Sequence, residues 1–153
     1  MPNITPFLWF DNNAEEAVDF YLSVFPNSHR TNELRAGDAG PGPKGSIVTI
    51  SFELDGKPFT ALNGGPGEAF NNSVSFFVHC KDQQEIDHYW SKLLEGGGSE
   101  IACGWLKDRF GVRWQIVPVN IMELIRPAGA MRAMMQMKKL DIDALKNAAK
   151  EPR

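Results

Sequence analysis

The chain repeats one local pattern, and this repeat constrains the fold more than any other feature. Asn13 and Asp82 each precede a Glu by three positions, the spacing of a helix-capping box. Behind each, apolar residues recur at helical intervals, which predicts helices over 13–25 and 82–95 with one buried stripe each. The stripes are Ala17, Phe20, Tyr21, Val24 and Phe25, and then Ile86, Tyr89, Trp90, Leu93 and Leu94.

Strand-like segments surround both helices in the same order. An apolar run precedes each helix, at 4–10 and at 73–80, and three segments follow it. Asp55-Gly56 is a strong signal for a two-residue hairpin turn. The sequence therefore predicts an α+β fold of two βαβββ modules, at about 4–65 and 73–119, within one domain of residues 1–125. The following segments are 28–35, 46–54 and 57–63 in the first module, and 99–103, 105–107 and 113–119 in the second.

The segment 126–153 lies outside the repeat and is predicted to be a helical C-terminal tail. Met131, Met134 and Met135 form a stripe at helical spacing, and Leu140 and Leu145 flank the cap residue Asp141 as a hydrophobic staple. Such a stripe is more often a packing surface than a cofactor site. The flexibility of methionine also suits a surface that adapts to a partner.

Composition and charge exclude several classes of protein. The net charge is -3 with acids and bases interspersed, so nothing favours a nucleic acid or an anionic membrane as partner. No segment approaches the roughly 20 apolar residues of a membrane span, and the N-terminus lacks a signal-peptide pattern. Cys80 and Cys103 have no paired spacing, which indicates reduced thiols. We therefore expect a cytoplasmic protein.

The glycine-rich segment 37–44 superficially resembles a phosphate-binding loop. Pro43 stands before Lys44 where such a loop has glycine, and proline removes amides that would bind phosphate. No glycine fingerprint follows the strand 4–10, so a Rossmann-type dinucleotide or S-adenosylmethionine site is not predicted either. The segment is interpreted as a flexible connection.

Side chains with metal-binding or nucleophilic chemistry are few and scattered. His29, His79 and His88 are interpreted as structural or solvated rather than as metal ligands. Cys103 lies near two basic residues and could be a nucleophile, but a small buried thiol is the favoured interpretation.

Three segments of the repeat, 4–10, 17–21 and 108–116, resemble the vicinal-oxygen-chelate superfamily, which includes glyoxalase I, extradiol dioxygenases, and fosfomycin- and bleomycin-resistance proteins. Within it the segments 63–66, 70–71 and 103–108 are similar to the PhnB-like branch, whose members often carry a demethylubiquinone methyltransferase label. The resemblance covers about residues 4–119. It implies a curved eight-stranded sheet around a cavity, with the helices outside, and modules that pair across subunits. Together with the methionine stripe it predicts a homodimer.

Metal-using relatives place their ligands at four strand positions facing the cavity. The resemblance maps these positions onto Thr5, Asn63, Ser75 and Gln115. None of the four is a histidine, carboxylate or thiolate, and neutral oxygens alone compete poorly with water for a metal ion. We therefore expect no metal and no cofactor.

Two functions of different class follow from this resemblance. The first is metal-free binding of a small organic ligand in the inter-module cavity, with the four polar residues orienting it and Phe7, Trp9, Phe77 and Trp105 as apolar walls. For Trp9 and Trp105, core packing is an equally good interpretation. The second is a glyoxalase-like lyase, isomerase or group-transfer enzyme, for which the acid/base candidates are Asp108, Lys107 and His79.

Overall fold

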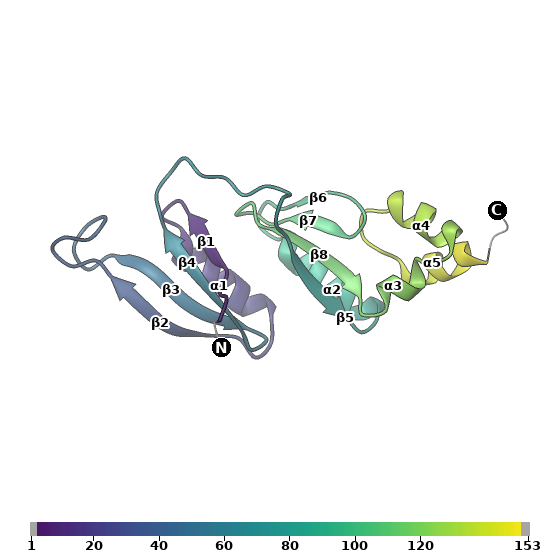
Figure 1. The fold of residues 1–153 in the computed structure, drawn as a ribbon, viewed down its shortest axis with the longest axis horizontal. Coiled ribbons are helices and arrows are strands. Elements are labelled where there is room, and N and C mark those ends of the chain that lie inside the picture. The colour runs from purple at the N-terminus through teal and green to yellow at the C-terminus, as the bar shows by residue number, and fades with distance from the viewer. Residues whose placement is uncertain (1–2, 151–153) are drawn as a thin grey trace. The chain divides into compact units, whose positions relative to one another are not determined.

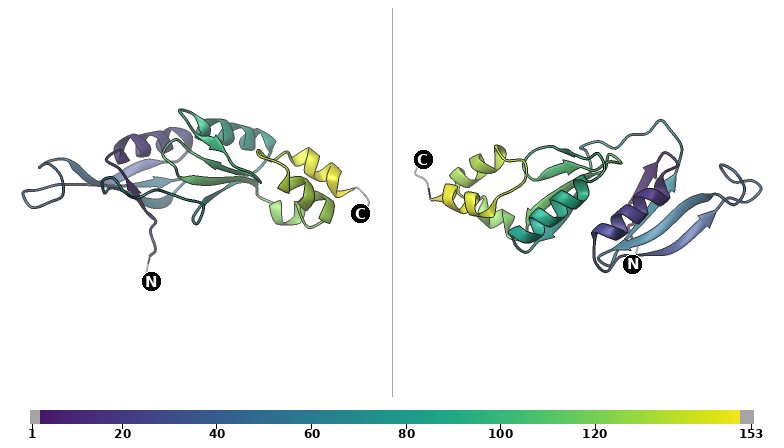
Figure 2. Two further views of the ribbon diagram at one scale, coloured as in Figure 1. Left: turned by 90° about the horizontal axis from the view of Figure 1, so that it is seen from above. Right: turned by 180° about the vertical axis from the view of Figure 1, so that it is seen from behind.

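The computed structural model describes residues 3–150 and contains both predicted modules (Figure 1). The chain divides into two compact units, Met1–Ala69 and Phe70–Arg153. Each unit holds a four-stranded sheet with a helix across one face, as the two views in Figure 2 make clear. Neither sheet closes into a barrel among the described residues. The predicted α+β class and the two βαβββ modules are confirmed; that the eight strands surround one cavity remains a prediction.

Unit 1 follows the predicted order of elements. These are β1 (Phe7–Phe10), α1 (Ala14–Val24), β2 (His29–Arg35), β3 (Ile47–Leu54) and β4 (Lys57–Asn63). The strands lie in the order β1-β4-β3-β2, with β1 parallel to β4 and the other pairs antiparallel. Asp55 and Gly56 both have positive φ, at 49° and 78°, as a tight hairpin between β3 and β4 requires.

Unit 2 repeats this topology. Its elements are β5 (Phe76–Cys80), α2 (Gln83–Leu94), β6 (Ser99–Glu100), β7 (Trp105–Lys107) and β8 (Arg113–Pro118), in the order β5-β8-β7-β6. The first strand again runs parallel to the last. β6 is shorter than predicted because the chain turns sharply at Cys103 and Gly104, where φ is positive.

One face of each sheet is buried beneath its helix. In unit 1, α1 packs against β3 and β4, and in unit 2, α2 packs against β7 and β8. Because strand side chains alternate between faces, every second residue points away from the helix. We call that opposite side the helix-free face. Buried residues on the helix side include Phe10, Ile50, Phe52 and Ala61 in unit 1, and Leu106, Trp114 and Ile116 in unit 2.

The two predicted helix caps differ in the structure. Asp82 caps α2 as expected: its Oδ1 accepts from the Glu85 amide at 2.9 Å. Asn13 precedes α1 but makes no side-chain cap, so that prediction was wrong. Its Oδ1 is buried without a partner, while the Ala14 amide donates to Oδ1 of Asn63 at 2.9 Å. A residue from the far end of the unit thus performs the capping role.

Three short helices follow β8: α3 (Ile121–Leu124), which precedes the tail, and α4 (Ala128–Met135) and α5 (Ile142–Ala149) within it. As predicted, Asp141 caps α5, accepting from the Ala144 amide at 3.0 Å. Leu140 and Leu145 are fully buried in a cluster with Val117 and Ile121, against which Met134 and Met137 pack. This cluster joins the tail to the end of β8 within unit 2. The domain boundary at residue 125 stays a prediction.

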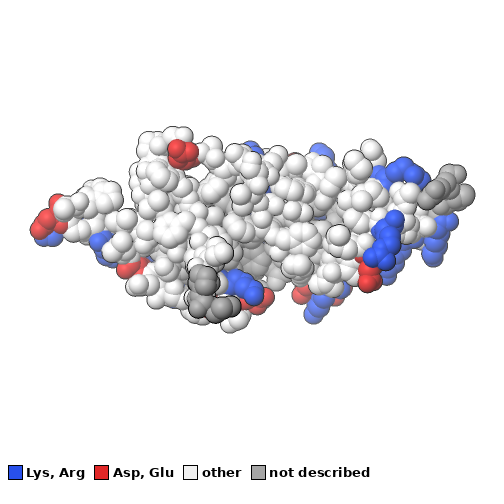
Figure 3. Space-filling model, in the orientation of Figure 1, with Lys and Arg blue, Asp and Glu red and all other residues white. Residues whose placement is uncertain are grey.

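The charges of the chain are less evenly spread than the sequence suggested. Lys and Arg side chains gather over the tail (Figure 3). No helix within residues 3–150 has the length and apolar character that crossing a membrane requires. The exposed basic residues of the tail include Arg126, Arg132, Lys138, Lys139 and Lys146.

Candidate functional site

In unit 2 the strand register brings together the predicted ligand-binding residues of the second module. Gln115 on β8 lies opposite Phe77 on β5 and opposite Trp105 on β7, so the three form one row across the sheet. Their neighbours Trp114 and Leu106 are buried on the helix side, which directs this row to the helix-free face. Gln115 Nε2 also donates to Ser75 Oγ at 2.9 Å.

This row combines apolar surface with a small polar group. Phe77 is 41% exposed, and Trp105, Gln115 and Ser75 are half-buried. With the Gln115 amide donating to Ser75, the amide carbonyl remains an acceptor and the Ser75 hydroxyl remains a donor. An exposed aromatic ring beside a donor and an acceptor suits a flat, mainly apolar molecule with one polar end.

In unit 1 the helix-free face carries Phe7, 62% exposed, and Trp9, 40% exposed. Thr5 precedes β1 and is exposed. Phe7 lies opposite Thr60 on the parallel strand β4, just as Phe77 lies opposite Gln115 in unit 2. Thr60 Oγ1 lies 3.5 Å from Ser51 Oγ. The repeat therefore makes Thr60, which sequence reasoning missed, the counterpart of Gln115.

The structure places Asn63 on the other face of the sheet from Phe7 and Trp9. Asn63 lies opposite Phe10, so it points to the helix side of the sheet and not to the face of Trp9. Its Nδ2 donates to the Ile47 carbonyl at 3.1 Å, and its Oδ1 accepts from the Ala14 amide. Both ends of the amide are thus used to join α1 to the sheet. Counting from the Asp55-Gly56 turn places Asn63 on the same side as Ala61, but only the structure shows that α1 covers this side.

Trp9 is held in place by the segment that follows β4. Its Nε1 donates to the Gly65 carbonyl at 2.9 Å, so the indole N–H is already occupied. A Cβ on Gly64 would overlap the indole ring, so the ring can lie over this segment only if residue 64 is glycine. Trp9 therefore offers its apolar ring, rather than its N–H group, to the helix-free face.

Of the acid/base candidates, Asp108 has a structural role. Its side chain is buried, and its Oδ1 accepts from the amides of Phe110 at 2.9 Å and Val112 at 3.0 Å. Its Oδ2 accepts from Trp114 Nε1 at 2.9 Å. The carboxylate holds the turn between β7 and β8 together and points to the helix side of the sheet.

The other two candidates lie on the helix-free face of unit 2. His79 is exposed, two positions from Phe77 on β5, and the two ring centroids are 4.7 Å apart. Lys107 is two positions from Trp105 on β7 and is half-buried. They are the titratable residues among our predictions that adjoin the Phe77–Gln115–Trp105 row.

The two thiols differ in environment. Cys80 is fully buried, and burial raises the pKa of its thiol to about 12, so it is inert at neutral pH. Cys103 is half-buried in a turn with φ of 56°. Within the described part of the chain, no group of three or more His, Cys, Asp or Glu side chains is placed to hold a metal ion.

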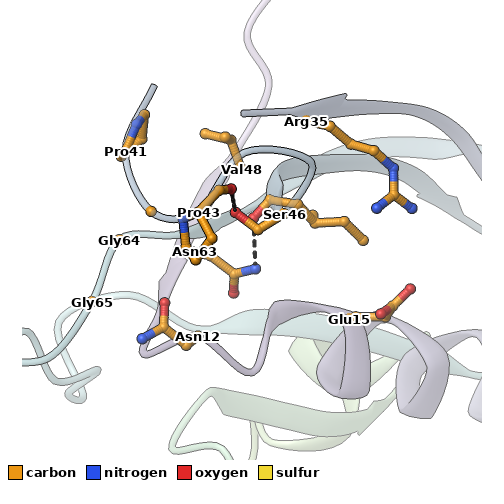
Figure 4. Close-up of a pocket in the computed structure, with 12 residues that line it drawn as sticks. Asn12, Glu15, Arg35, Pro41, Pro43, Ser46, Val48, Asn63, Gly64 and Gly65 are labelled. Atoms are coloured by element: carbon orange, nitrogen blue, oxygen red, sulfur yellow. Dashed lines mark hydrogen bonds between the residues drawn. The ribbon is translucent and has the colours of Figure 1, made fainter. Parts of the chain in front are cut away.

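A cavity of about 620 Å³ lies on the other side of the unit 1 sheet (Figure 4). The loop between β2 and β3, interpreted from sequence as a flexible connection, forms one wall, and the start of α1 forms another. Arg35 and Glu15 bring opposite charges to one end of it. The Asn63 amide, whose Nδ2 donates to the Ile47 carbonyl, also lines the cavity. The lining residues are Asn12, Glu15, Arg35, Pro41, Gly42, Pro43, Ser46, Ile47, Val48, Asn63, Gly64 and Gly65.

Two βαβββ modules with aromatic residues on their helix-free faces define an α+β protein built from a duplicated module. A family model described as 3-demethylubiquinone-9 3-methyltransferase matches residues 2–117, and the chain belongs to this family. The predicted PhnB-like membership is thereby confirmed.

Solved structures agree with this assignment. The PhnB protein from Bacillus cereus is 32% identical, with a TM-score of 0.66, over 74% of this chain and 97% of that one. The protein PA1353 from Pseudomonas aeruginosa is 25% identical, with a TM-score of 0.61, over 74% of this chain and 95% of that one. A comparison with functionally curated proteins finds no match.

Proposed function

We propose that the protein binds a small organic ligand, without a metal ion, on the helix-free face of unit 2. The observation that carries this proposal is the hydrogen-bonded Ser75–Gln115 pair set beside Phe77 and Trp105. The ligand's flat apolar body stacks on the two aromatic rings, and its polar group meets the Gln115 carbonyl and the Ser75 hydroxyl. In unit 1, Thr5, Phe7 and Trp9 are exposed on the corresponding face, and Thr60, at the register position of Gln115, is buried.

The metal-free part of the proposal rests on the donor chemistry. Hydroxyl and amide oxygens bind Mg²⁺ or Ca²⁺ as supplements to carboxylates and compete poorly with water for Zn²⁺, Ni²⁺ or Fe²⁺. We expect elemental analysis of the purified protein to find well under one transition-metal ion per chain. One zinc, nickel, manganese or iron per chain that is lost in Gln115→Ala would contradict this part of the proposal.

The test of ligand binding is a thermal-shift screen of metabolites and drugs, with a chelator present throughout. A ligand at ~100 times its Kd adds about 2.7 kcal/mol of stability, which raises the Tm of a chain of this size by roughly 5–10 °C. Gln115→Leu, which keeps the side-chain volume but removes the amide, should abolish most of that shift. The matched control is Gln84→Leu, an exposed change on α2.

Two results would contradict the proposal. One is a screen in which no compound raises the Tm. The other is a shift of equal size in wild type, Gln115→Leu and Phe77→Ala, because the ligand would then bind elsewhere. The cavity beside Arg35 and Glu15 would be the next place to look.

The alternative is an enzyme of the lyase, isomerase or group-transfer type. The specific observation in its favour is exposed His79 beside Phe77, where a general base could reach a ligand on the same face. If a ligand found in the screen is turned over, His79→Gln should abolish turnover and preserve binding. If the wild-type protein binds the ligand but does not turn it over, ligand binding is the only one of the two functions that remains.

The assembly and location of the protein complete the proposal. We propose a homodimer. Of the predicted methionine stripe, Met134 packs within its own chain, and Met131 and Met135 remain exposed. A cytoplasmic location is proposed from the two free cysteines.

A further inference from the structure

The wall residue Trp105 follows a turn whose backbone is unusual. Cys103 and Gly104 have successive positive φ values of 56° and 86°, and Cys103 is not a glycine. A residue with a side chain keeps this conformation only where its surroundings hold it. Within the turn, the Trp105 amide donates to the Ala102 carbonyl at 2.9 Å, and Ile116 donates to the Gly104 carbonyl at 2.7 Å. The turn thus fixes the start of β7 and the position of its first side chain, Trp105.

The C-terminal tail binds this turn directly. The Cys103 amide donates to the Met137 carbonyl and the Gly104 amide to the Lys138 carbonyl, both at 2.8 Å. Leu140 packs on Gly104 so closely that a Cβ there would lie 3.1 Å from Leu140 Cδ1. Both amides of the left-handed pair are therefore held by residues of the tail.

The tail is itself joined to α2 by Gln83 and by an ion pair of 2.8 Å between Lys139 Nζ and Asp87 Oδ1. Gln83 Oε1 accepts from the Ile142 amide at 2.8 Å, and Gln83 Nε2 donates to the Leu140 carbonyl at 2.9 Å. The same Nε2 donates to Asp87 Oδ1 at 3.0 Å. Gln83 thus bonds to the tail backbone on both sides of Asp141. These bonds lie just after Met137 and Lys138, whose carbonyls accept from the turn.

We propose that the C-terminal tail is a positioning element for the ligand site, which holds the Cys103–Gly104 turn and thereby sets the place of the Trp105 wall. The proposal rests on the proposed function only in taking Trp105 to contact the ligand. The family model ends at residue 117, and the match to the Bacillus cereus protein leaves about a quarter of this chain outside it. The tail therefore adds to the shared modules a support for one side of the site.

The position of Trp105 can be tested without any ligand. The chain has four tryptophans, so fluorotryptophan labelling gives four fluorine NMR signals, and Trp105→Phe identifies the signal of Trp105. Gln83→Leu removes both hydrogen bonds between Gln83 and the tail backbone, one donated to the Leu140 carbonyl and one accepted from the Ile142 amide. We expect it to shift or broaden the Trp105 signal and to leave that of Trp9, in unit 1, unchanged. The matched control Gln84→Leu, one residue along α2, should change neither signal.

A stronger variant guards against a null result. Leu140→Ala removes the side chain that packs on Gly104, and it should perturb the Trp105 signal in the same direction as Gln83→Leu. If both variants fold, as judged by circular dichroism, and both leave the Trp105 signal at its wild-type position, the positioning proposal is wrong.

The effect on binding is then measured by calorimetry with the compound that gives the largest shift in the thermal screen. Gln83→Leu should weaken its Kd by about 3- to 10-fold, as expected for a residue that acts through a contacting group, while Gln84→Leu leaves Kd unchanged. A shifted Trp105 signal with unchanged Kd would overturn the link between tail and site. If the screen yields no compound, the proposed function fails, but the fluorine signals still decide whether the tail positions Trp105.

Discussion

The buried carboxylate of Asp108 gives the sharpest test of how the second module is held together. It accepts from two backbone amides and one indole N–H, with N···O distances of 2.9, 3.0 and 2.9 Å. Asp108→Asn keeps the shape of the side chain but replaces one acceptor oxygen with an NH₂ group. The best arrangement keeps the oxygen on the two amides and turns the NH₂ group toward Trp114 Nε1, where two donors then face each other.

The expected loss follows from these contacts. A buried donor left without a partner costs about 1–3 kcal/mol, and two hydrogen bonds that lose a charged acceptor each weaken by several tenths or more. We therefore expect Asp108→Asn to lower the free energy of unfolding by about 3 kcal/mol. With a urea m-value of about 2 kcal/mol/M, the midpoint should fall by about 1.5 M.

The assay is urea unfolding followed by circular dichroism, with exposed Asp38→Asn as the control, expected within about 0.5 kcal/mol of wild type. Combining Asp108→Asn with Trp114→Phe, which removes the facing donor, should recover part of the loss. A loss below about 1 kcal/mol for Asp108→Asn alone would refute the structural role. Asp108 would then return to the list of acid/base candidates.

Four further predictions follow. Asn63→Ala should cost about 1–3 kcal/mol in urea unfolding, because the Ala14 amide and the Ile47 carbonyl lose their partner; Asn147→Ala, an exposed change on α5, is the control. Trp90→Ala should cost about 3–5 kcal/mol, since the ring lies on the buried side of α2, and a loss under about 1 kcal/mol would mean that the stripe faces solvent. Burial raises the pKa of Cys80 from 9.0 to about 12. Its thiol therefore favours the folded state fully below pH 9, and this contribution disappears between pH 9 and 12 as the unfolded thiol ionises; urea midpoints should show a steeper fall there in wild type than in Cys80→Ala. In sedimentation, a dimer has twice the 17.0 kDa of one chain, and a 17.0 kDa species at micromolar concentration would exclude it.

The sequence by itself determined the elements and their order, because their signals lie within a few residues of one another. The stripes of both helices are spaced by the helical turn, and the Asp82 cap reaches only as far as Glu85. The Asp55-Gly56 turn likewise fixed the β3–β4 register from two residues. These local interactions form in the same way wherever the segment lies in the fold.

Only the tertiary structure decided which polar side chains lie on the helix-free face of a sheet and which hold the fold together. Asn63, at the end of β4, caps α1 because β1 and β4 pair in parallel. The paired residues are more than 50 positions apart in the chain, and no turn sets their register. Asp108 was a plausible acid or base by its type, and it is structural because three donors converge on it. The contact between Met137 and Cys103 joins the tail to the turn before Trp105 through backbone groups. Backbone groups carry no side-chain signature, so that contact became visible only when the chain was folded.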